Sequence, residues 1–238
     1  PHHTISGAGL SGGGTIPRPG EISLAHNGIL FLDELPEFSR QALEILRQPL
    51  EDKQVTISRA SGTVTYPCSF MLVAAMNPCP CGYFGHPTRK CICDKKQAHA
   101  YINRISGPLL DRFDIQVEVA PVEYEHLSSG AKEESSEAIR ERVQAAREIQ
   151  QKRFAGTDIT CNAMITPDIL HDVCPMTDEA SVMLKNVFEK MGLSARAYDR
   201  ILKVARTVAD MEGEEVIGKS HIARAVQFRS LDRKYWSE

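Results

Sequence analysis

The sequence has 238 residues, enough to bury a sizeable core in one large domain or two small ones. Its net charge of −3, from 28 basic and 31 acidic residues, excludes a global basic field, so any nucleic-acid binding must use local patches. No apolar run approaches the roughly 18 residues of a membrane span, and the cysteines follow a metal-type rather than a disulfide pattern, so we expect a cytoplasmic protein.

The first segment, residues 1–28, is rich in Gly and Pro and is predicted to form a loop or hairpin. Arg18 lies between two prolines and should be exposed. The adjacent His2 and His3 have poor spacing for binding one metal ion, so we expect both on the surface.

An acidic pair follows an apolar run in residues 29–35. The four large apolar residues predict a strand buried on both faces, as in parallel sheets. Asp33 and Glu34 would then emerge at its carboxyl end, the edge where open α/β sheets bind ligands. One acid there can hold Mg²⁺ and the other can polarise a water molecule. The alternative is a core strand followed by a solvated turn.

A helix and a hairpin come next. Ser39 can cap a helix in which leucines recur at helical spacing. Residues 55–58 and 63–66 are alternating β-rich runs that predict a hairpin with Arg59 at its tip. An ordinary solvated turn would explain the same letters.

The apolar run 70–76 predicts a second buried strand, which Asn77 and Pro78 end. Asn77 could orient a water molecule or contact a phosphate. It could equally cap the turn, because Asn before Pro is a common turn signal.

A cysteine cluster follows at once, in two pairs separated by nine residues: Cys79 with Cys81, and Cys91 with Cys93. Four thiolates can hold a tetrahedral Zn²⁺, although the one-residue spacing within each pair is tighter than usual. Free or redox-active thiols and an iron–sulfur cluster are the alternatives. The cluster is bordered by the basic residues Arg89, Lys90, Lys95 and Lys96.

The remaining chain predicts one more strand and then helices. Arg112, which could form a surface ion pair, precedes an alternating strand at 115–119. A polar connection at 121–136 and a helix at 137–154 should follow. Helices are then expected after Thr166, Thr177, Ser194 and Ser220. The predicted organisation is an α/β domain over 1–154, with a Cys-rich insert at 79–93, and an all-α domain over 155–238.

Residues 213–220 match the P-loop expression G-x-x-x-x-G-K-S. We reject a P-loop here, because an amphipathic helix rather than a strand precedes the motif and two glutamates within it would repel phosphate. The first residue is not an initiator Met and no signal peptide follows. We therefore expect a fragment of a longer protein, with a P-loop before Pro1, and poor ATP binding by the fragment alone.

These motifs together resemble the AAA+ ATPases of the magnesium-chelatase-like group, specifically the bacterial YifB/ComM competence-related proteins. The resemblance covers essentially the whole chain. The stretches that carry it are residues 1–6, 17–28, the acidic strand, 47–52, 75–82 and 107–112. It implies a partial AAA+ core with a parallel sheet and β-hairpin inserts, followed by an α-helical lid.

The resemblance also implies roles for single residues. Asp33 would coordinate Mg²⁺ beside ATP, and Glu34 would activate the attacking water, which Asn77 would help to place. Arg112 would be the arginine finger that reaches the γ-phosphate of a neighbouring subunit, and such fingers contribute roughly 10³–10⁵ in rate. Arg196 would be the sensor-2 arginine, acting within its own subunit or across an interface.

In this clade two hairpins surround the pore of a ring, which is expected to be a hexamer. The Gly-rich opening resembles the helix-2 insert and residues 55–66 resemble the pre-sensor-1 hairpin, so Arg18 and Arg59 become candidates for contact with a DNA backbone.

Three functions compete. The first is a motor for branch migration or unwinding, acting on branched or single-stranded DNA. The second is a magnesium-chelatase ATPase subunit that drives metal insertion into a porphyrin. The third is a non-enzymatic, zinc-stabilised interaction module.

Overall fold

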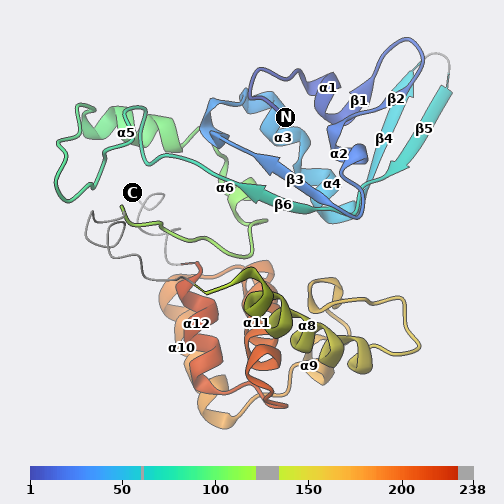
Figure 1. Cartoon of the computed structure of the whole chain (residues 1–238), viewed down its shortest axis with the longest axis vertical. Coiled ribbons are helices and arrows are strands. Elements are labelled where there is room, and N and C mark those ends of the chain that lie inside the picture. The colour runs from blue at the N-terminus through green and yellow to red at the C-terminus, as the bar shows by residue number, and fades with distance from the viewer. Residues whose placement is uncertain (60–61, 122–133, 230–238) are drawn as a thin grey trace. The chain divides into compact units, whose positions relative to one another are not determined.

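The computed structural model of the chain describes residues 1–59, 62–121 and 134–229 (Figure 1). They form two compact units, Pro1–Phe113 and residues 114–229, each with its own hydrophobic core. The boundary lies after Phe113, whereas the sequence predicted it after residue 154. The long helix α8 (Ser136–Arg153) therefore belongs to the second unit. None of the described helices combines the length and apolar character that crossing a lipid bilayer requires.

A parallel pair of strands forms the centre of the first unit. Strand β3 (Ile29–Leu32) pairs with β6 (Met71–Ala74), which confirms the predicted parallel pairing. Leu30 and Leu32 are buried, whereas Ile29 and Phe31 are 62% and 49% exposed. The expectation that this strand is buried on both faces is therefore wrong for the described residues, because the core lies against one face of the pair only.

Four short helices contribute to that core: α1 (Gly7–Ser11), α2 (Glu21–Leu24), α3 (Arg40–Ile45) and α4 (Arg47–Asp52). Ser39 caps α3 as predicted, since its hydroxyl accepts a hydrogen bond from the N–H of Ala42 at 3.2 Å. Leu43 and Leu46 are buried, so the leucine row faces the strands. The helix α1 was not predicted, because its glycines indicated a loop.

Two antiparallel hairpins lie side by side in this unit (Figure 1). Strands β1 (Gly12–Gly13) and β2 (Arg18–Pro19) form the first, and β4 (Gln54–Arg59) and β5 (Gly62–Pro67) form the second. Both hairpins were predicted, although residues 60–61 of the second turn lie outside the described residues. The two pack closely, since a Cβ on Gly12 would lie 2.6 Å from the Ile57 side chain. Position 12 requires glycine because its φ is +97° and that Cβ would lie 2.4 Å from the Arg18 carbonyl oxygen.

Short elements complete the first unit. The acidic pair leads into a 3-10 turn, η1 (Leu35–Glu37), and the cysteine loop leads into α5 (Lys95–Ile102). Helix α6 (Gly107–Leu110) then precedes Arg112.

The expected strand at 115–119 is not present among the described residues. Ile115, Val117 and Val119 are all more than half exposed. The N–H of Gln116 donates to the carbonyl of Phe228 at 2.8 Å instead of joining a ladder. Alternation alone does not make a strand where no neighbouring strand supplies backbone partners.

The second unit is helical, as predicted. Besides α8 it contains η2 (Asn162–Met164), α9 (Leu170–Val173), α10 (Asp178–Met191), α11 (Ala195–Glu212) and α12 (Lys219–Gln227). Thr177 and Ser194 cap α10 and α11 through their hydroxyls, as expected. Two starts differ from the prediction. The helix after Thr166 begins only at Leu170, and α12 begins after Gly218 rather than Ser220.

The P-loop-like letters join two helices, which confirms that they are not a P-loop. Gly213 ends α11 in the left-handed conformation (φ 76°), and the N–H of Gly218 donates to Nδ1 of His221 at 2.9 Å at the start of α12. No strand precedes the motif, so it lacks the strand–loop–helix geometry that cradles phosphate.

A buried charged network ties α8 to α11. The Asp210 carboxylate accepts hydrogen bonds from Arg153 (2.8 Å), Asn162 (2.7 Å) and Arg206 (3.1 Å). The side chains of Asp210 and Arg206 are both 0% exposed. Burial alone would raise the pKa of Asp210, but the hydrogen bonds from Arg153 and Asn162 outweigh it and lower that pKa.

Candidate functional site

The acidic pair lies at the carboxyl end of β3, as predicted, and both side chains are exposed. Glu34 adopts the left-handed backbone conformation (φ 53°), which costs about 1–2 kcal/mol for a residue with a Cβ. Its N–H donates to the Asp33 carboxylate at 2.9 Å. This bond closes the turn that follows β3.

The segment after β6 emerges at the same edge. The N–H of Ala75 donates to the carbonyl of Leu32, and the N–H of Leu35 donates to the carbonyl of Ala75, both at 3.0 Å. These bonds extend the pairing beyond the strands, so Asn77 follows β6 at the end where Asp33 and Glu34 follow β3. The predicted juxtaposition of these elements is present.

Sequence reasoning missed His3. The structure places Nδ1 of His3 3.2 Å from Oε2 of Glu34. The imidazole is half-buried rather than on the surface, and its edge faces the ring of Phe38 with centroids 6.4 Å apart. His2 is exposed, as expected. Nothing in the local pattern indicates this contact, because His3 and Glu34 are 31 positions apart in the chain.

A second set of polar residues borders the acidic edge. Arg104 donates to the Pro36 carbonyl at 3.1 Å and to Glu37 at 3.3 Å. Burial, together with the negative charges of Glu37 and Glu34, raises the pKa of Tyr101 to about 12. Tyr101 is therefore a neutral phenol at any physiological pH.

Arg112 is held within its own unit. Its guanidinium forms an ion pair with Glu51 at 2.8 Å and donates to the carbonyls of Arg47 (3.0 Å) and Pro108 (2.5 Å). The sequence predicted that Arg112 could form an ion pair at the surface. The ion pair is present, but the Arg112 side chain is only 7% exposed, so it is not at the surface. Any action on a neighbouring subunit requires Arg112 to leave these partners.

Arg196 lies in the first turn of α11, after the Ser194 cap, and is exposed. Its place in the helix agrees with the prediction. Its role as a nucleotide contact stays a prediction.

The four cysteines of the predicted cluster come together. The sulfurs of Cys79, Cys81, Cys91 and Cys93 all lie within 4.8 Å of one another. The Cys79 sulfur is 3.4 Å from that of Cys81 and 3.7 Å from that of Cys91, and the sulfurs of Cys81 and Cys91 are 3.5 Å apart. A tetrahedral centre with metal–sulfur bonds of about 2.3 Å needs sulfurs about 3.8 Å apart. The cluster could therefore bind a metal ion with small adjustments.

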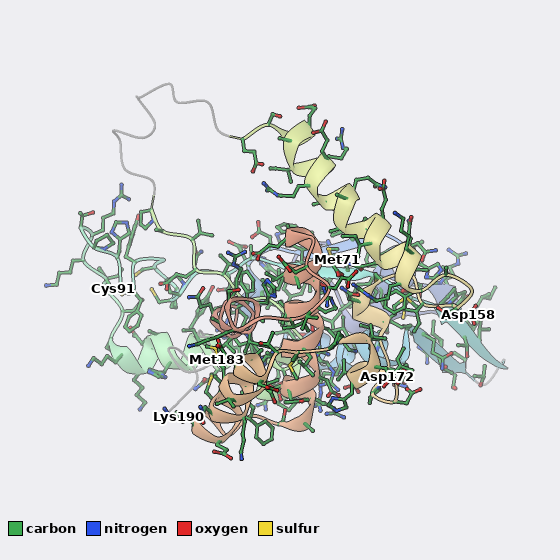
Figure 2. All side chains as sticks on the ribbon, turned by 90° about the horizontal axis from the view of Figure 1, so that it is seen from below. Met71, Cys91, Asp158, Asp172, Met183 and Lys190 are labelled. Carbon is green, nitrogen blue, oxygen red and sulfur yellow. The ribbon has the colours of Figure 1, made fainter. Side chains whose placement is uncertain are left out.

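The pKa values of the cluster thiols are shifted in opposite directions. The N–H groups of Tyr83 and Ile92 help to lower the pKa of the Cys81 thiol to about 6, whereas burial raises the pKa of Cys91. The loop that carries Cys91 leads into α5 (Figure 2). Gly82 lies beside Asn77, since a Cβ built on Gly82 would be 3.9 Å from the Asn77 side chain.

The paired hairpins bring the two predicted DNA-contact residues close together. Arg18 pairs with Gly13 in the first hairpin, and a Cβ on Gly13 would lie 3.0 Å from the Arg59 guanidinium. The Tyr66 hydroxyl donates to the Pro17 carbonyl at 3.1 Å and joins the hairpins. Arg18 and Arg59 are both exposed, so they contribute to one basic surface.

Comparison with known proteins places the chain in a family. Residues 1–127 match the magnesium chelatase family, subunit ChlI, and residues 133–229 match the C-terminal part of subunit ChlI. The chain is 47% identical over 234 residues to "Competence protein ComM" of Haemophilus influenzae and 45% identical over 235 residues to "Uncharacterized protein YifB" of Escherichia coli. A relative from Mycobacterium tuberculosis, Rv2897c, is 39% identical over 230 residues.

These alignments cover 96–98% of the chain but only 45% of each relative. The parallel strand pair followed by a helical unit fits part of an AAA+-like fold in general. The chain thus belongs to the magnesium chelatase ChlI family, among the members that include ComM and YifB.

Proposed function

We propose that the complete protein is an ATP-hydrolysing motor that acts on DNA and that this chain supplies its hydrolytic edge. The observation that carries the proposal is the parallel pairing of β3 with β6, which delivers Asp33 and Glu34 to the edge where Asn77 follows. Two exposed carboxylates and an amide form the oxygen-rich donor set that suits Mg²⁺ and a water molecule. Family membership supports ATP as the nucleotide.

Each residue at this edge has a separate task in the proposal. Asp33 holds Mg²⁺, which supplies charge neutralisation at the phosphates when bound. Glu34 accepts a proton from the attacking water, and Asn77 positions that water through its amide.

The proposed assembly is a ring of identical subunits, taken to be a hexamer. Arg112 would act on the site of a neighbour after leaving Glu51. Arg196 would contact nucleotide from the helical unit.

DNA is the proposed substrate because the two hairpins form one exposed basic surface. Arg18 and Arg59 would contact the phosphate backbone, a mode that gives no sequence preference. The relative named for competence supports this choice.

The cysteine cluster is proposed to hold a structural Zn²⁺. Four sulfurs at near-tetrahedral spacing suit zinc, and a closed set of four ligands has no open position for catalysis. The ion would fix the loop between β6 and α5.

The test uses the full-length protein with Glu34→Gln. We expect ATP to bind and turnover to fall at least about 100-fold, since the amide cannot accept the proton. The matched control is Glu37→Gln, which alters a neighbouring acid that pairs with Arg104 and should leave turnover within about twofold. Equal activity in the two variants would remove Glu34 from its role.

A magnesium-chelatase ATPase subunit is the second candidate, because the family description names that enzyme. Branched DNA should stimulate ATP hydrolysis if the protein is a DNA motor. Stimulation only by a porphyrin-binding partner would favour the chelatase function, and no hydrolysis at all would favour a non-enzymatic module.

A further inference from the structure

The contact between His3 and Glu34 has no place in the function proposed so far. His3 Nδ1 lies 3.2 Å from Glu34 Oε2, and the two side chains are 30% and 53% exposed. Within the described part of the chain, this is the one close polar contact shown for the Glu34 carboxylate. The backbone of Glu34 is fixed by its bond to Asp33, so His3 fixes what remains free, the side-chain torsions.

His3 is itself held in place. Its ring lies edge-on to Phe38, which is 2% exposed and belongs to the core. The N–H of Ile5 donates to the carbonyl of His2 at 3.0 Å and closes a turn around His3. The next turn is fixed by Ser6, whose hydroxyl caps α1. His3 therefore reaches Glu34 from a turn that is anchored on both sides.

The neighbouring histidine shows that this contact is specific to position 3. Nδ1 of His2 accepts from the N–H of Thr4 at 3.3 Å and contacts its hydroxyl at 2.9 Å, so His2 is used within its own turn. Only His3 is directed to the acidic edge.

We propose that His3 is the positioning residue for Glu34, holding Oε2 so that Oε1 takes the proton of the attacking water. This inference rests on the proposed function. A base oriented by a third group is a common arrangement, because a carboxylate free to rotate spends little time in the productive geometry. The ring atom that faces Glu34 is Nδ1, so the proposal requires a hydrogen on that nitrogen.

The geometry supplies a sharp test, because Asn and Gln mimic different ring nitrogens. An amide N–H at position 3 replaces Nδ1–H in His3→Asn, whereas His3→Gln places it one bond further out, near Nε2. We measure kcat, the KM for ATP and the ATP dissociation constant of full-length protein carrying His3→Ala, His3→Gln or His3→Asn.

We expect kcat to fall about 10-fold for Ala and Gln, as for loss of one orienting polar contact at a half-exposed site. The Asn variant should retain kcat within about threefold, and ATP affinity should change less than about twofold in all three. This split between kcat and binding is not what a merely structural role would produce.

Three results would overturn the inference. Wild-type kcat in all three variants would show that Glu34 needs no orienting partner. An Asn variant as impaired as Ala would exclude the Nδ1 contact, and lost ATP binding in all three would make His3 structural. Turnover that needs Glu34 but not His3 refutes this inference alone, whereas a wild-type protein without turnover refutes the proposed function as well.

Discussion

Replacing Asp210 with Asn should destabilise the second unit severely while leaving its shape unchanged. The carboxylate is fully buried and accepts from three donors, Arg153, Asn162 and Arg206. Removing one partner of a buried ion pair costs about 3–5 kcal/mol, because it leaves an uncompensated buried charge. Arg206 keeps hydrogen bonds to the carbonyls of Glu214 and Glu215, so we expect the lower end, about 3 kcal/mol.

The assay is urea unfolding of the chain, followed by helical circular dichroism. Asp158→Asn is the matched control, since Asp158 is an exposed acid in the same unit (Figure 2) and surface substitutions change stability by less than about 0.5 kcal/mol. Equal unfolding free energies for the two variants would refute the idea that the network holds α8 to α11.

The pH dependence of this difference has a definite sign. The pKa of Asp210 is lowered in the folded state, so its contribution is present above the unfolded pKa of about 3.9 and is lost as pH falls through the lower folded value. The gap between wild type and Asp210→Asn should therefore be constant from about pH 5 to 7 and narrow below about pH 4.

Two further predictions concern the cysteines and the subunit contact. Metal analysis should find about one zinc per chain, and Cys81→Ser or Cys93→Ser should abolish it, since three thiolates bind much more weakly than four; a folded wild-type protein free of metal would contradict this. Arg112→Ala should reduce turnover by about 10³ or more, and mixing it with a full-length P-loop variant should restore part of the activity. If the mixture has no activity, that result would argue against action across an interface. In Glu51→Gln, Arg112 is released more readily, so turnover of this variant should not fall.

Much of the site was predictable because its signals are local. An apolar run ending in Asp33 and Glu34 indicates both a strand and the edge at which its acids emerge. The cysteine spacing indicates a cluster. Helix starts with a hydroxyl cap, as at Ser194, were also found, because the cap and the apolar row that follows share one short window.

The remaining features depend on contacts between distant residues. Whether Phe31 is buried depends on what covers its side of the strand pair, which a run of apolar letters does not reveal. The alternating residues 115–119 pair with no strand in the part of the chain that the structure describes. The contact between His3 and Glu34 and the burial of Arg112 against Glu51 depend on the folded chain, since no spacing rule relates those positions.

The cysteine loop also affects how DNA binding should be measured. A zinc ion with four thiolates carries a formal charge of −2. In residues 81–97, four cationic side chains and the one carboxylate of Asp94 give a net charge of +3. The zinc-loaded centre therefore neutralises most of the positive charge of the residues around it. A preparation stripped of metal would keep at most the charge of the Cys81 thiolate, so most of that positive charge would be exposed. The metal-free protein would bind polyanions without selectivity. Its measured affinity for DNA would then reflect the loss of zinc rather than binding by the hairpins.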